Sequence, residues 1–229
     1  MTKFTNFVNR APLFIGLSLI STSFTALPSS NSPLLTNNSI EFKNSTYIAY
    51  GKDNEQLVLK SKKGNINLSN KAINLIDEVE GKFILDGKTF NLKAESLSGS
   101  LLDKSIFSKE RVLFLSNSIE VISSSMEITQ TQPEGVKILF INANLVSINS
   151  KSNIHKGKAN KIKFFPAKDL IFMEGDTELY QQNMKIISDE IHYDLNKDRI
   201  LKSVNSRIIN TLWNYLSKIL ANTILLRLL

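Results

Sequence analysis

Residues 89–94, with the sequence TFNLKA, decide the fold class of this 229-residue chain. In an extended backbone, the phenylalanine, leucine and alanine of this stretch point to one face, and the asparagine and lysine point to the other. The apolar run before it, residues 83–85, leads into Asp86 and Gly87, a dipeptide that supplies the positive φ of a tight hairpin turn. The stretch therefore predicts two antiparallel strands with one apolar face.

The same pattern continues along the chain. Alternating or β-branched runs recur at residues 118–122, 136–141 and 184–187. Turn-prone segments lie between such runs, at residues 132–135, 149–153 and 181–183. Short strands with turn chemistry between them predict one all-β domain, built as an antiparallel sandwich, barrel or roll, between about residues 40 and 209.

An internal repeat supports stacking of similar units. Residues 160–164 (NKIKF) match residues 189–193 (DEIHY) at an offset of 29 positions, and Asp176 matches Asn205 at the same offset. A single strand–turn–strand unit cannot bury its own apolar face, so such units stack along an axis. Chance similarity between two β-hairpins is the alternative explanation.

The N-terminal segment has the features of a targeting sequence. Lys3 and Arg10 precede an uncharged stretch at residues 11–27, which Pro28 and a Ser/Asn-rich run follow. This order of basic, apolar and small residues is typical of a secretory signal peptide. At 17 residues the stretch is also close to the roughly 20 needed for a membrane-spanning helix. An uncleaved membrane anchor is therefore the alternative interpretation. Both interpretations place the chain after about residue 35 outside the cytoplasm.

The basic charge identifies no partner by itself. The chain carries a formal net charge of +7 and contains no cysteine, so the fold does not depend on disulfides. Its lysines are scattered, and the densest run, residues 60–63, has no neighbouring aromatic side chain on which a nucleic-acid base could stack. We therefore interpret the charge as a solvated surface and expect no nucleic-acid partner.

Several short segments resemble a known family. Residues 189–194 (DEIHYD) with 198–201 (DRIL) resemble the repeat shared by the LptA and LptC families of the lipopolysaccharide-transport bridge. Residues 175–179 (GDTEL) resemble the strand start that accompanies this repeat. The opening segments at 47–51 (YIAYG) and 56–60 (QLVLK) resemble LptC, the membrane-anchored member. The segments 90–95, 111–115 and 119–121 resemble its next repeat, so the resemblance covers roughly residues 40–209.

The resemblance implies an architecture and a role. The fold it implies is an open β-jellyroll over residues 36–209, preceded by a signal peptide or signal anchor at residues 1–35. The role is a lipopolysaccharide-transport adaptor in the inner membrane, single-pass, with a periplasmic domain. It would receive the lipid from an inner-membrane ABC transporter and pass it to a periplasmic bridge protein by pairing of edge strands. A soluble LptA-like bridge protein with a cleaved signal, or a secreted β-solenoid or adhesin-like protein, are the alternatives.

An apolar groove is the implied binding site. Each acyl methylene exposed to water costs about 0.8 kcal/mol, so a lipid crosses water only inside such a groove. Inward positions of the predicted strands are the candidate lining; the alternative is that they fill a closed core. The ten candidates are Phe90, Leu92, Ile119, Val121, Ile138, Phe140, Ile162, Phe164, Ile191 and Tyr193.

The sequence offers no catalytic or cofactor motif. His155 and His192 are isolated, so we expect structural or exposed roles for both, and without cysteine a zinc site would need scattered carboxylates. Neither a Gly-x-Ser-x-Gly elbow nor a phosphate-binding glycine loop is present. The paired carboxylates at 77–78 and 189–190 are expected at strand ends, in solvent. We predict a protein without catalytic activity, cofactor or metal.

The C-terminal extension, residues 210–229, is apolar and departs from the family pattern. Leu212, Leu216, Ile219, Leu220 and Ile224 recur at helical spacing, which predicts a short helix. Packing against the roll is slightly favoured over a membrane-surface helix or a poorly ordered extension. If it covers the terminal sheet edge, it would interfere with end-to-end stacking there.

Overall fold

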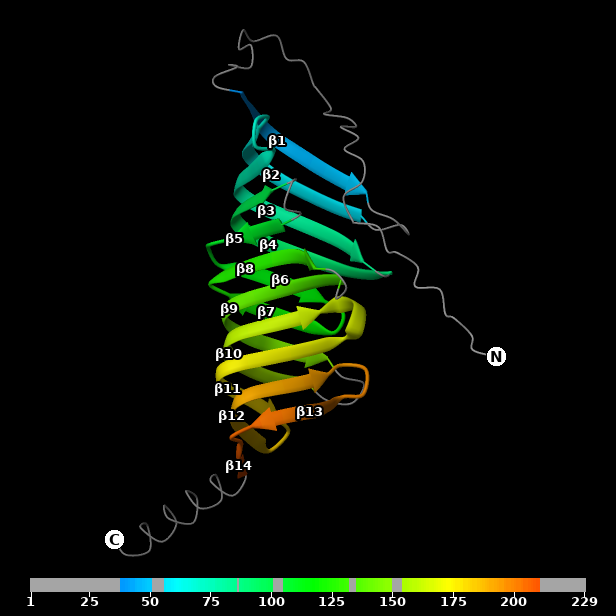
Figure 1. Cartoon of the computed structure of the whole chain (residues 1–229), viewed down its shortest axis with the longest axis vertical. Coiled ribbons are helices and arrows are strands. Elements are labelled where there is room, and N and C mark those ends of the chain that lie inside the picture. Colours follow the sequence, from blue (N-terminus) through cyan, green and yellow to red (C-terminus); the bar gives the residue numbers. More distant parts are fainter. Residues whose placement is uncertain are drawn as a thin grey trace, which may run out of the picture.

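The computed structural model describes residues 38–50, 56–85, 87–100, 105–131, 135–149 and 154–210. Within these ranges the chain forms one antiparallel sheet of fourteen strands, stacked along the long axis of the molecule (Figure 1). The first strands are β1 (Ser39–Tyr50), β2 (Gln56–Asn67), β3 (Ala72–Leu85), β4 (Lys88–Ser100), β5 (Ser105–Ser108), β6 (Val112–Ser116) and β7 (Ile119–Ser123). The stack continues with β8 (Ser125–Thr131), β9 (Gly135–Asn149), β10 (Ile154–Phe165), the 3₁₀ turn η1 (Pro166–Lys168), β11 (Leu170–Gln181), β12 (Met184–Asp194), β13 (Arg199–Val204) and β14 (Arg207–Asn210).

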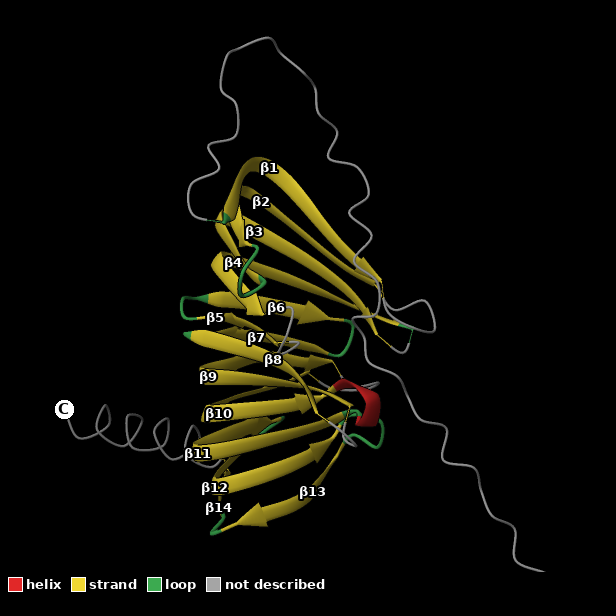
Figure 2. Cartoon of the chain, turned by 45° about the horizontal axis from the view of Figure 1, so that its top comes forward, coloured by secondary structure: helices red, strands yellow, loops and turns green. Residues whose placement is uncertain are grey.

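The long strands bend in their middle and so contribute to two layers. In β3, residues 72–76 pair with the second half of β2, and residues 80–84 pair with its first half. A register shift separates the two halves, and the bend residues Asp77 and Glu78 have positive φ. Bulges of this kind bend a strand sharply, which folds the sheet over onto itself. The result is the open β-jellyroll expected from the sequence, and Figure 2 shows its stacked strands in yellow.

The strand pairings define the members of each layer. Layer one contains β5, β8 and β13 with one half of each long strand, including residues 72–76, 161–165 and 190–194. Layer two contains β6, β7 and β14 with the other halves, including residues 88–94 and 154–158. The bends lie along one side of the stack. We call the opposite side, where the outer ends of the two layers face each other, the mouth.

The internal repeat is confirmed at the bends. The Asn160 amide donates a hydrogen bond to Asp176 (2.9 Å), and the Asn205 amide donates one to Asp189 (2.6 Å). These pairs occupy equivalent positions 29 residues apart, with the asparagine and the aspartate exchanged. Asp176 and Asn205 both have positive φ, which Asp and Asn tolerate better than most residues. The repeated unit is therefore a pair of bent strands held at its bend by one side-chain bond.

Two expectations about local positions were wrong. Residues 175–176 are not a strand start, because β11 runs continuously from Leu170 to Gln181 and bends there. The carboxylate pairs at 77–78 and 189–190 likewise lie at bends inside β3 and β12, not at strand ends. Alternation alone cannot reveal a bend, because both halves of a bent strand keep the same period of two.

The predicted strand runs and the hairpin turn at residue 87 are confirmed, and the predictions for the two termini stay untested. The strand runs at 89–94, 118–122, 136–141 and 184–187 lie almost entirely in β4, β7, β9 and β12. Gly87 has a φ of 73° in the hairpin that pairs Leu85 with Lys88, while Asp86 lies outside the described residues. The signal or anchor at residues 1–35 and the C-terminal extension after residue 210 lie outside the described residues as well.

Candidate functional site

All ten predicted lining residues are buried between the two layers. Their centre is a cluster of four phenylalanines drawn from both layers. Phe114 lies 5.7 Å from Phe90, 5.3 Å from Phe140 and 6.4 Å from Phe164, measured between ring centroids. Each of these rings is at most 1% exposed. The middle of the interior is thus filled by the protein's own aromatic side chains, and lipid contact by these residues stays a prediction.

A pocket lies between the layers nearer the N-terminal end of the stack. It encloses about 10 Å³, or about 320 Å³ when its open side is included, and none of the ten predicted residues lines it. Layer two contributes Tyr47 of β1 together with leucines of β2, and layer one contributes side chains of β3, β4 and β5. The lining consists of Tyr47, Leu57, Leu59, Ile73, Leu75, Leu97, Gly99, Ser100, Ser105 and Ile106.

Small residues form part of the pocket lining. Gly99, Ser100 and Ser105 are the small residues of the lining, and Gly99 lets Ile73 and the Ser105 carbonyl approach closely, at 3.1 and 3.2 Å from the position that a Cβ would take. Burial raises the pKa of the Tyr47 hydroxyl above its ordinary value of 10.0, so Tyr47 stays protonated at neutral pH. The pocket therefore combines apolar walls with a few hydroxyl groups. The run of small residues at 98–100 was the sequence signal that could have located it.

His155 is buried and structural, as predicted. Its Nε2 lies 3.0 Å from Oδ1 of Asp198, and the Tyr193 hydroxyl donates a hydrogen bond to the same oxygen. The ring of His155 meets that of Tyr193 edge-on at 5.8 Å. Burial, followed by the bond and the charge of Asp198, raises the pKa of the Tyr193 hydroxyl. This group of three residues binds the turn at residues 195–198 to the strands on either side of the interior.

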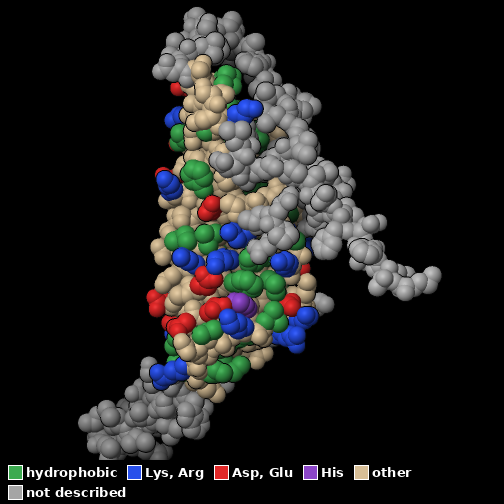
Figure 3. Space-filling model, in the orientation of Figure 1, with side chains coloured by type: hydrophobic (Ala, Val, Ile, Leu, Met, Phe, Trp, Pro, Cys, Tyr) green, Lys and Arg blue, Asp and Glu red, His purple; other side chains and the backbone are tan. Residues whose placement is uncertain are grey.

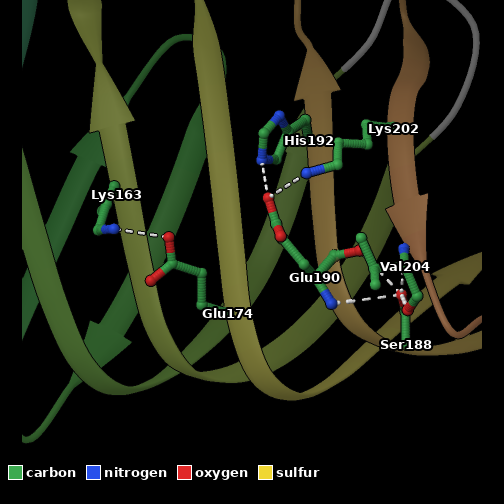
Figure 4. A network of polar contacts seen from close by, with 7 residues as sticks. All are labelled: Lys163, Glu174, Ser188, Glu190, His192, Lys202 and Val204. Carbon is green, nitrogen blue, oxygen red and sulfur yellow. Dashed lines mark hydrogen bonds and ion pairs between the residues drawn. The ribbon is translucent and has the colours of Figure 1, made fainter.

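The second histidine belongs to a charged network on the outer face of layer one (Figure 4). The Glu190 carboxylate accepts a hydrogen bond from Lys202 (3.1 Å) and also contacts Nε2 of His192. These two partners, Lys202 first, lower the pKa of Glu190. Nearby, Lys163 of β10 pairs with Glu174 of β11 at 2.6 Å. A carboxylate held in its charged form by lysine is not available as a general acid, which fits a structural role.

The Ser188 hydroxyl secures the bend beside this network. It lies 2.8 Å from the Glu190 carbonyl oxygen and 2.6 Å from that of Val204, and it accepts a hydrogen bond from the Val204 amide (Figure 4). The ladder between β12 and the last strands is interrupted at this point, so backbone groups need another partner. A small buried hydroxyl supplies it.

The basic run at residues 60–63 is balanced by carboxylates of the neighbouring strand. Lys62 pairs with Glu78, and Lys63 pairs with Asp77 at 2.7 Å. On the face shown in Figure 3, Lys and Arg side chains are interspersed with Asp and Glu. Mixed charges of this kind agree with the expected solvated surface, because nucleic-acid binding relies on lysines and arginines clustered on one face.

The described part of the chain offers neither a cluster of metal ligands nor a helix that could span a membrane. Among residues 38–210, leaving aside the gaps given above, His, Asp and Glu form no group of three or more that could hold a metal ion. In the same part of the chain, none of the helical segments has the length and apolar character needed to cross a membrane.

Comparison with known proteins gives a family match and similarities to solved structures. Residues 91–199 match the model of the family described as LptA/(LptD N-terminal domain) LPS transport protein. No curated protein matches the sequence. A solved structure that resembles this one is LptH, the LptA homologous periplasmic component of the lipopolysaccharide transport device of Pseudomonas aeruginosa. The identity is 11% and the TM-score is 0.46, over 52% of this chain and 93% of that chain.

The family segment can be placed on the fold. It begins in β4, ends at the first residue of β13, and contains nine of the ten predicted lining residues, with Phe90 directly before it. Strands β1–β3, which supply half of the pocket lining, precede it in the sequence. Residues 91–199, slightly less than half of the chain, are thus similar to the LptA/LptD N-terminal domain family of lipopolysaccharide-transport proteins.

Proposed function

We propose that this protein is a periplasmic component of lipopolysaccharide transport that holds acyl chains between its two layers. The observation that carries the proposal is the apolar pocket at the N-terminal end, which adjoins a continuous apolar core in a chain similar to this family. Its walls are almost wholly apolar, which suits acyl chains. No catalytic step is needed for this role, because transfer only moves the lipid from one apolar environment to another.

The size of the pocket indicates how much of the lipid it holds. The space it encloses is about 10 Å³, room for about one water molecule and far below the roughly 300–1,000 Å³ of small-molecule pockets. The pocket therefore marks a place where the two layers are less tightly filled, and acyl chains enter it only when the layers separate. The ten buried residues proposed from the sequence would then contact lipid in an opened state.

The finer proposal is an adaptor anchored in the inner membrane by residues 1–35, with the domain of residues 36–209 in the periplasm. It would take lipid from an inner-membrane ABC transporter and pass it to a bridge protein. Among the described strands, β1 pairs only with β2, so its outer edge offers backbone groups for strand addition. The soluble LptA-like bridge is the second candidate, and the description of the matching family favours it. A secreted β-solenoid has no further observation in its favour.

Membrane extraction separates the two candidates. For the adaptor we expect the full-length chain to stay with the membrane pellet after alkaline carbonate treatment, because an apolar helix resists extraction. Recovery of a shortened chain in the soluble periplasm would identify the bridge instead.

Photo-crosslinking tests lipid binding itself. A benzoylphenylalanine in place of Tyr47, inside the pocket, is expected to capture lipopolysaccharide on irradiation of cells. The matched control replaces Tyr180, an exposed tyrosine of β11 at the opposite end of the stack, and should capture none. Equal capture at both positions, or none at residue 47, would contradict the proposed function.

A further inference from the structure

Two polar bridges join the layers across the mouth. Lys88 is the first residue of β4 and lies at the outer end of layer two, whereas Asp169 lies in the turn between β10 and β11 at the outer end of layer one. The Lys88 ammonium donates hydrogen bonds to Oδ1 of Asp169 (2.5 Å) and to the carbonyl oxygen of Pro166 (3.1 Å). These residues are about 80 positions apart in sequence, so the bridge exists only when the layers are closed.

The second bridge is the contact between His155 and Asp198. His155 is near the start of β10 at the outer end of layer two, and Asp198 belongs to the turn between β12 and β13 at the outer end of layer one. The two bridges are coupled through Asp169. Its Oδ2 accepts a hydrogen bond from the Asn196 amide (2.9 Å), and its carbonyl oxygen accepts one from the backbone amide of Leu195 (2.9 Å).

Asp169 is therefore the centre of the arrangement. It has a φ of 51°, and its side chain is only 13% exposed. The carboxylate accepts hydrogen bonds from Lys88 and Asn196, and the main-chain carbonyl accepts one from the Leu195 amide. We call the group of Lys88, Asp169, His155 and Asp198 the clasp. The aromatic cluster lies behind it, since Phe90 follows Lys88 by two residues and its ring is 6.0 Å from that of Phe164.

We propose that the clasp is a gate for acyl chains between the N-terminal pocket and the aromatic interior. This inference rests on the proposed function. The middle of the interior is filled and its mouth is bridged, so a chain can enter it only after the layers move apart at the bends. Polar bridges suit such a gate, because lysine and carboxylate exchange their mutual bond for water at small net cost, whereas an apolar seam would resist exposure.

A reversible crosslink provides the test, because the chain has no cysteine of its own. Lys88→Cys and Asp169→Cys are joined by a short methanethiosulfonate linker that a reductant removes. The matched control joins Lys163→Cys and Glu174→Cys, another ion pair of similar length whose members lie in neighbouring strands of layer one. In each protein a photo-crosslinking residue replaces either Tyr47 or Phe164, and capture of lipopolysaccharide is measured with and without reductant.

The proposal predicts different results at the two positions. With the clasp linked, we expect capture at residue 47 to persist and capture at residue 164 to fall about tenfold or more, and reductant to restore it. The control linker should change neither. Capture at residue 164 that is unaffected by the clasp linker, or absent with and without reductant, overturns the gate. Absence of capture at residue 47 in the unlinked protein overturns the proposed function itself.

A variant that opens the gate should increase lipopolysaccharide capture at residue 164, whereas the linker decreases it. Lys88→Met keeps the aliphatic stem but removes the ammonium, so the open state becomes about tenfold more populated, the shift that loss of one charged hydrogen bond produces. We expect faster capture at residue 164 than in the parent, with Lys163→Met as the unaffected control. An unchanged rate in Lys88→Met would contradict the gate.

Discussion

Replacing Phe114 by alanine is expected to lower the free energy of unfolding by about 3–5 kcal/mol, the range found for phenylalanine removed from a packed core. Phe114 is fully buried and contacts aromatic rings of both layers. Its loss leaves a cavity between sheets whose backbones are held by ladder hydrogen bonds and cannot collapse fully. Urea unfolding followed by circular dichroism measures the change.

The control for this variant is Phe107→Ala. Phe107 lies in β5 on the outer face, half-buried, with Lys109 near its ring. Because solvent already reaches this side chain, we expect a loss of about 1 kcal/mol or less. Equal losses at the two positions would mean that the aromatic cluster is not the packed centre of the fold. A small loss at Phe114 alone would mean that the interior is loose enough to refill the space.

Replacing Asp198 by alanine is expected to cost about 2–4 kcal/mol of unfolding free energy. Its Oδ1 accepts bonds from His155 and Tyr193, both of which are fully buried, so the variant leaves two buried polar groups without that acceptor. Asp198→Asn keeps an acceptor oxygen and tolerates the positive φ of this position, so it should recover most of the loss.

Asp176→Ala is the matched control for Asp198. Asp176 also has positive φ and also accepts a side-chain hydrogen bond, from Asn160, but it is exposed at a bend. Any strain from alanine in the left-handed region is thus shared by both variants, and only the buried network differs. A loss at Asp198 no larger than that at Asp176 would show that the network contributes little.

The same network gives the stability a dependence on pH. The pKa of Tyr193 is raised in the folded protein, first by burial and then by Asp198. Its contribution is complete below the unfolded pKa of about 10 and declines as the pH rises above that value, because the unfolded chain then loses a proton that the folded chain keeps. Tyr193→Phe should flatten this decline in urea unfolding measured between about pH 9 and 11.

Alternation along the chain was sufficient to predict the strands and the inward side chains. Phe90, Phe140 and Tyr193 were assigned to an interior face from a period of two, and all three are buried. This succeeds because successive side chains of a strand point to opposite faces regardless of the strand's partners. The 29-residue repeat was also readable, since equivalent bends need equivalent Asp and Asn residues.

The bends, the pocket and the clasp were not predictable from sequence. Residues 175–176 resemble a strand start but lie inside β11, because local sequence does not show whether a chain continues into a second layer. The pocket is lined by small residues of β4 and β5 together with leucines of β2 and β3. The clasp joins Lys88 to Asp169, whose relation arises only when the outer ends of the two layers meet.

The sequence by itself determined that this chain is all-β, which side chains face inward, and that its units repeat, because these properties follow from backbone geometry and residue chemistry within a few positions. Tertiary structure decided where the interior is filled, where it is hollow and what closes its mouth. Those features depend on distances between residues far apart in the chain, which the folding of one layer over the other sets.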